Sequence, residues 1–227
     1  MKGWAVAAAA TMAAAVPAVA ETTADATPAP AARVEGPRVV HAGEGVAVRV
    51  PAAAAYVGSE RFTLYGVADA EVHVFAEADA RRRVRRLYWI QFESYLPERP
   101  ELGYDYADGN RRMELWGIPT WVRAGPARTD GPVRAGSDRE HVTAILARAG
   151  YAIPLEAMNV RLVQLLDDPQ GTGRGRRELM LIYAEDLTPT GLSVAELAGE
   201  DGPGPRWVPL EQPLIDRAAA AFTVEQR

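Results

Sequence analysis

The chain of 227 residues contains no cysteine, one lysine and three histidines. Without cysteine it has neither disulfides nor a thiol nucleophile, so its fold must be stabilised by the burial of apolar side chains. The formal net charge of −5 makes it a poor candidate for binding the phosphates of nucleic acids. We therefore expect no nucleic-acid partner.

Long apolar runs are also scarce, and the clearest one lies within the first twenty residues, "MKGWAVAAAATMAAAVPAVA". A positive charge, an apolar run and a terminal Ala-Val-Ala follow the order of a secretory signal peptide, for which we predict cleavage after Ala20. Pro17 interrupts the run and argues against the alternative, a retained membrane anchor. The sequence thus predicts a periplasmic or secreted bacterial protein with no transmembrane segment in the mature chain.

The rest of the chain divides into a tail and a folded part. Residues 21–37 are small, polar and rich in proline and alanine, which predicts a flexible linker. Residues 38–227 are expected to form one α+β domain with a mostly antiparallel sheet and one or two packed helices. Strands are predicted from short alternating runs at residues 46–50, 61–68, 71–78, 84–95, 113–123, 160–167 and 178–185.

Two helices are expected. The first, "SDREHVTAILARAG", has Ser137 as its N-cap, Glu140 as the reciprocal capping residue and Gly150 just after its end. The second covers residues 210–222, where apolar side chains recur with helical spacing.

The most informative stretch is "RRRVRRLYWIQFESYL", residues 81–96. The segments 71–78 and 84–95 flank a short turn and predict a hairpin, in which we expect His73 to lie opposite Trp89. This pairing gathers rings and polar groups on one face of the sheet. The residues expected on that face are Glu71, His73, Phe75, Glu77, Leu87, Trp89, Gln91, Glu93 and Tyr95.

This face has the chemistry of a small-molecule site, because aromatic rings supply contact area while carboxylate and amide groups orient a ligand. The alternative is the solvated side of an ordinary antiparallel sheet. The candidate ligand-binding residues are His73, Trp89, Gln91, Glu93 and Tyr95. The loop that follows Tyr95 carries Tyr104 and Tyr106, which we expect to cover the face.

Catalytic patterns are few. His73 is the best placed of the histidines for acid–base chemistry, and Glu71, Glu77 and Glu93 offer a carboxylate group for glycoside chemistry. The glycine-rich residues 167–177 run between two predicted strands, unlike a phosphate-binding loop, which precedes a helix, and we expect a mobile hairpin loop there. We expect no metal site and no cofactor.

Three functions are compatible with these features. The leading hypothesis is an exported module that binds a small molecule or a partner protein through the face that carries Trp89. One alternative is a hydrolase or lyase that uses His73 or the Glu71, Glu77 and Glu93 group. The other is an interaction or structural protein of the cell envelope.

Overall fold

The computed structural model describes residues 29–108, 110–199 and 202–226. The predicted signal peptide and its cleavage site after Ala20 lie outside these residues, as does most of the predicted linker. Strand β1 (Arg33–Glu35) pairs with β2 (Arg38–His41), so the end of the segment predicted as a linker is part of the fold.

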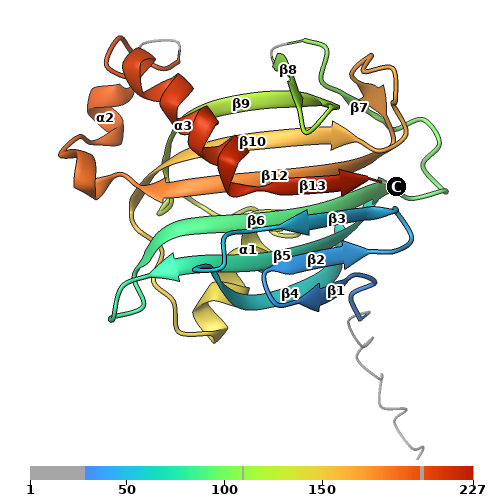
Figure 1. The fold of residues 1–227 in the computed structure, drawn as a ribbon, viewed down its shortest axis with the longest axis horizontal. Coiled ribbons are helices and arrows are strands. Elements are labelled where there is room, and N and C mark those ends of the chain that lie inside the picture. Colours follow the sequence, from blue (N-terminus) through green and yellow to red (C-terminus); the bar gives the residue numbers. More distant parts are fainter. Residues whose placement is uncertain (1–28, 109, 200–201, 227) are drawn as a thin grey trace, which may run out of the picture.

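A seven-stranded antiparallel sheet forms the centre of the molecule (Figure 1). Its strand order is β4-β5-β6-β12-β10-β9-β8. The bounds are β4 (Ala55–Leu64), β5 (Ala68–Ala78), β6 (Val84–Tyr95), β8 (Arg111–Leu115), β9 (Ile118–Arg128), β10 (Glu156–Leu165) and β12 (Arg177–Asp186). The central strands are rich in β-branched and aromatic residues, and both of their faces are buried.

One face of this sheet, which we call the α3 face, is covered by two elements. The first is a small sheet in the order β1-β2-β3-β13, with β3 (Val46–Arg49) and β13 (Thr223–Gln226). The second is α3 (Val208–Ala221), which follows the short helices η1 (Thr188–Thr190) and α2 (Val194–Leu197). Side chains such as Ile90, Leu162 and Leu214 pack between the layers to form the larger core.

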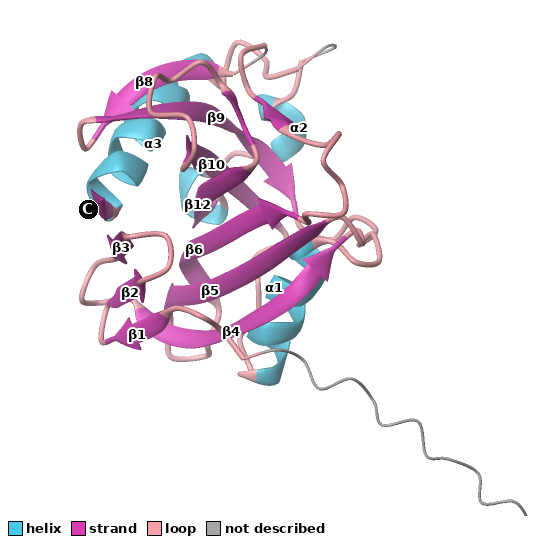
Figure 2. Cartoon of the chain, turned by 90° about the vertical axis from the view of Figure 1, so that its right-hand side faces the viewer, coloured by secondary structure: helices cyan, strands magenta, loops and turns pink. Residues whose placement is uncertain are grey.

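The opposite face, which we call the α1 face, is covered by α1 (Asp138–Arg148), as Figure 2 shows. The N-cap prediction is confirmed, because Ser137 accepts from the amide of Glu140; the Glu140 carboxylate, however, accepts from the amide of Gly136 rather than from that of Ser137. Gly150 has a φ of 73°, as expected just after a helix end. Gly58 lets the helix approach β4, since a Cβ there would lie 3.0 Å from Ile145.

The expected α+β class is confirmed in part, because the described residues form a mostly antiparallel sheet with few helices. The predicted strand 113–123 is instead two strands, β8 and β9, which turn tightly at Trp116 and Gly117. The predicted loop 167–177 contains β11 (Arg174–Gly175), which pairs with β7 (Tyr104–Asp105). Of the helices described, none has the length and apolar character needed to cross a membrane.

Candidate functional site

The hairpin of β5 and β6 forms as expected, but its register differs by one residue from the prediction. His73 pairs with Ile90, and Trp89 pairs with Val74. The register shifts between Glu77 and Ala78, where β6 carries an extra residue close to the turn. This bulge reverses the relative facing of the two strands, so His73 lies on the α3 face and Trp89 on the α1 face.

Four of the five candidate ligand-binding residues do share the α1 face, and three of them form a hydrogen-bonded chain. Nε1 of Trp89 donates to Oε1 of Gln91 over 2.7 Å, and Nε2 of Gln91 donates to Oε2 of Glu93 over 2.6 Å. Gln91 is fully buried, and Trp89 and Glu93 are each 7% exposed. The side-chain amide of Gln91 is therefore already hydrogen-bonded to Trp89 and Glu93. Of the three residues, Trp89 is the one whose apolar ring could contact a ligand.

The loop after β6 covers one end of this face, as the sequence predicts. The Tyr104 hydroxyl donates to Oε1 of Glu93 over 2.9 Å, and its ring lies 4.6 Å from that of Tyr95. The pairing of β7 with β11 holds Tyr104 in place, and the amide of Tyr106 donates to the carbonyl of Gly173 over 2.8 Å. Arg176 supports the loop by donating to the backbone carbonyls of Leu96, Arg99 and Pro100.

A second carboxylate, missed in the sequence, lies beside Glu93. Glu178 is its direct cross-strand partner on β12, is 1% exposed, and accepts a hydrogen bond from the Tyr106 hydroxyl over 2.7 Å. Burial, followed by the nearby charge of Glu93, raises the pKa of Glu178 to about 8. Burial likewise raises the pKa of Glu93. The two carboxyl groups therefore do not both ionise at neutral pH.

The predicted carboxylate group of Glu71, Glu77 and Glu93 does not assemble. Glu71 and Glu77 lie on the α3 face and Glu93 on the α1 face. Oε1 of Glu71 lies 2.8 Å from Nε2 of His73, and the Glu71 carboxylate also accepts from the amides of Ala31 and Ala32.

Although burial opposes ionisation of Glu71, the hydrogen bonds from His73 and from these amides hold its pKa below the usual range. Both side chains are almost fully buried. The Glu71 carboxylate anchors the first described residues of the chain to β5.

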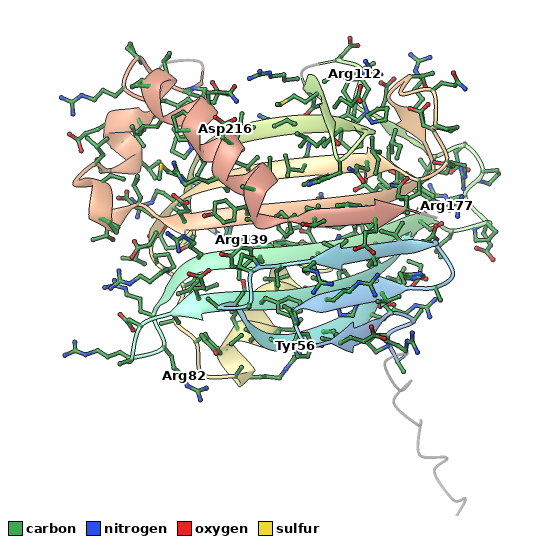
Figure 3. The ribbon with its side chains drawn as sticks, in the orientation of Figure 1. Tyr56, Arg82, Arg112, Arg139, Arg177 and Asp216 are labelled. Carbon is green, nitrogen blue, oxygen red and sulfur yellow. The ribbon has the colours of Figure 1, made fainter. Side chains whose placement is uncertain are left out.

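The arginines at the start of β6 are occupied by neighbours. Arg86 forms an ion pair with Glu77 at 2.8 Å, and Arg85 with Asp186 at 2.6 Å. Arg82 donates to the carbonyl of Ala149 from the protruding turn labelled in Figure 3. At the other end of the sheet, Arg177 lies beside the turn between β2 and β3 (Figure 3), where it pairs with Glu44.

A cavity of about 260 Å³ opens beside Trp89 on the α1 face. The sheet supplies its floor and α1 one wall, and its lining is mostly apolar. We call it the Trp89 cavity. Its lining includes Leu87, Trp89, Val142, Ile153, Ala157 and Ala184.

In the described part of the chain, no three His, Asp or Glu side chains are grouped so that they could hold a metal ion. Comparisons with profiles of known protein families, with curated proteins and with solved structures find no match to this chain.

The Glu93–Glu178 pair predicts a pH-dependent stability. Folding raises the pKa of Glu178 from an ordinary 4.5 to about 8, so the native state retains a proton that the unfolded chain releases between these values. The free energy of unfolding should fall as the pH rises through this window. Glu178→Gln keeps an acceptor for Tyr106 and removes the titration.

The free energy of unfolding of Glu178→Gln, taken relative to that of the wild type, should be at least about 1 kcal/mol higher at pH 8.5 than at pH 5. This corresponds to roughly 2–4 °C in Tm. Thermal unfolding at both pH values measures this gain. The exposed substitution Glu98→Gln serves as the control and should show no such change. An equal stability difference between Glu178→Gln and the wild type at both pH values contradicts the prediction.

The Glu71 anchor predicts a large loss of stability on truncation. Glu71→Ala leaves three donors without their acceptor, those of Ala32 and His73 buried and that of Ala31 partly buried, and should lower the free energy of unfolding by about 3 kcal/mol. Glu225→Ala removes only an exposed ion pair with Arg38 and should cost less than about 1 kcal/mol. Urea denaturation compares the two variants, and equal losses would show that Glu71 has no anchoring role.

Proposed function

We propose that this chain is an exported binding module that takes a small, largely apolar molecule into the Trp89 cavity. The N-terminal sequence supports export, and the cavity supports binding. The observation that carries the proposal is an apolar hollow of about 260 Å³ with a tryptophan on its floor, between a helix and a sheet. Its size lies just below the usual range for ligand pockets, about 300–1,000 Å³, which favours a small ligand.

The construction of the cavity favours a ligand site over a packing defect. Leu87 and Trp89 of β6 and Ala157 of β10 provide the floor, while Val142 of α1 and Ile153 close the sides. Two polar side chains of α1, Arg139 and Thr143, stand at the same wall. An apolar surface with a few polar groups at its margin is the usual composition of a small-molecule pocket.

The other candidate residues act as support in this proposal. The hydrogen-bonded chain from Trp89 through Gln91 to Glu93 fixes the indole ring. The indole N–H donates to Gln91, whose side chain is in turn fixed by its hydrogen bond to Glu93. Tyr104 closes the far end of that chain. The indole therefore presents its apolar surface to the cavity in one orientation, which lowers the entropic cost of binding.

A neutral fluorescent dye, 1-anilinonaphthalene, tests the proposal. Ala184→Phe places a phenyl ring in the cavity, and we expect it to weaken dye binding at least about tenfold. Ala55→Phe makes the same change at an exposed position of β4 and should bind the dye as the wild type does. Dye emission measures binding, and thermal unfolding verifies that both variants fold.

Two results would overturn the proposed function. One is the lack of saturable dye binding by the wild type. The other is an unchanged dye affinity in a folded Ala184→Phe variant, which would place the bound dye elsewhere.

A further inference from the structure

The Trp89 cavity adjoins a second and larger pocket of about 560 Å³. Asn159 and Ile182 line both spaces, which therefore lie side by side on the α1 face, and we call the two together the groove. We call the second space the arginine pocket, because Arg123 and Arg161 line it. On its outer side it runs around the edge of β9 towards Val194 and Ala198.

We infer that the ligand of this groove is an amphipathic organic anion, whose apolar body occupies the Trp89 cavity and whose carboxylate, sulfonate or phosphate group binds Arg123 and Arg161. This inference rests on the proposed binding function and adds the chemical class of the ligand. It follows from the way in which charge and space are distributed along the groove.

The two arginines are direct cross-strand partners on β9 and β10. Like charges in that position repel each other and are unfavourable unless an anion lies between them. Among the residues that the structure describes, neither guanidinium has an ion-pair or hydrogen-bond partner. Arg161 lies over the ring of Tyr106, with its Cζ 5.4 Å from the ring centroid.

The charge of Arg161 acts on the carboxyl groups of Glu93, Asp138 and Glu178, but none of them forms an ion pair with it, and burial raises the pKa of each. The two acidic residues that line the groove are held by other partners. Asp186 accepts from Arg85 over 2.6 Å and from the amide of Thr188. Glu185 is held by Arg217 and by the Tyr183 hydroxyl. The carboxyl groups that line the groove are thus engaged by residues outside it, whereas its cationic groups at the β9 edge are not.

The strand residues next to the arginines leave room for a head group. Gly125 is the cross-strand partner of Asn159, and a Cβ added at Gly125 would meet no atom within 4 Å. The Asn159 side chain lies where the apolar and cationic parts meet. Guanidinium groups bind carboxylate, sulfonate and phosphate oxygens through paired, charge-assisted hydrogen bonds, which suits a head group in this position.

A matched pair of dyes tests the inference. 8-Anilinonaphthalene-1-sulfonate has the apolar body of 1-anilinonaphthalene and adds one anionic group. We expect the wild type to bind the sulfonate at least about tenfold more tightly than the neutral dye, because charge-assisted hydrogen bonds are among the stronger ones. Fluorescence titration of the purified chain at low and high salt measures both affinities.

The double variant Arg123→Gln/Arg161→Gln should lose this tenfold advantage and keep its affinity for the neutral dye. Arg49→Gln, an exposed change on β3 of the small sheet, is the control and should behave as the wild type does. Each arginine variant is also tested for folding by its Tm. Raised salt should weaken binding of the sulfonate and leave the neutral dye unaffected.

The outcomes separate the two proposals. Saturable binding of both dyes with equal affinity overturns the anionic class and leaves the binding function in place. Retention of the sulfonate preference in the folded double variant overturns the role of the two arginines. Failure of both dyes to bind overturns the binding function itself.

Discussion

The pairing of β6 with β12 is the interaction on which the rest of the structure depends. It joins two strands separated by more than eighty positions and sets which side chains meet on each face. On the α1 face it places Trp89 beside Ile182 and Glu93 beside Glu178. On the α3 face the same pairing buries Ile90 beside Leu181 in the larger core. A slip of one residue would exchange the two faces, so burial on both sides fixes the register.

The polar side chains of Gln91, Glu93 and Glu178 on the α1 face are costly to bury, and each of them is hydrogen-bonded to a neighbour. An isolated carboxylate in this position would lose its hydration without compensation, whereas Glu93 accepts from Gln91 and from Tyr104. Burial, followed by the carboxyl groups of Glu93 and Glu178, to which the two hydroxyls donate, raises the pKa values of Tyr104 and Tyr106, so both remain hydroxyl donors. The tyrosine loop and the carboxylates thus stabilise each other, and the Trp89 indole is held in place as a consequence.

Much of this arrangement follows from local sequence patterns, and the remainder depends on long-range pairing. Alternation within residues 84–95 places Trp89, Gln91 and Glu93 together, and the loop after Tyr95 covers them as expected. The prediction that His73 lies on the same face as Trp89 is wrong, because an alternating pattern does not reveal a bulge beside a turn. Glu178 and Arg161 escape detection for a different reason: their neighbours on β6 and β9 are set by pairing between distant segments, which one sequence does not specify.

The groove itself follows from an imbalance between the two faces of the sheet. A small sheet and α3 cover the α3 face, whereas α1, an 11-residue helix about 16 Å long, contacts β4 and β5 on the other. Seven strands spaced about 4.8 Å apart extend well beyond one helix. The tyrosine loop covers one end of the remaining surface, and the floor beyond it changes from Leu87 and Trp89 to Arg161 and Arg123. A ligand with an apolar part and an anionic part would match this arrangement and would cover the surface that α1 and the tyrosine loop leave open.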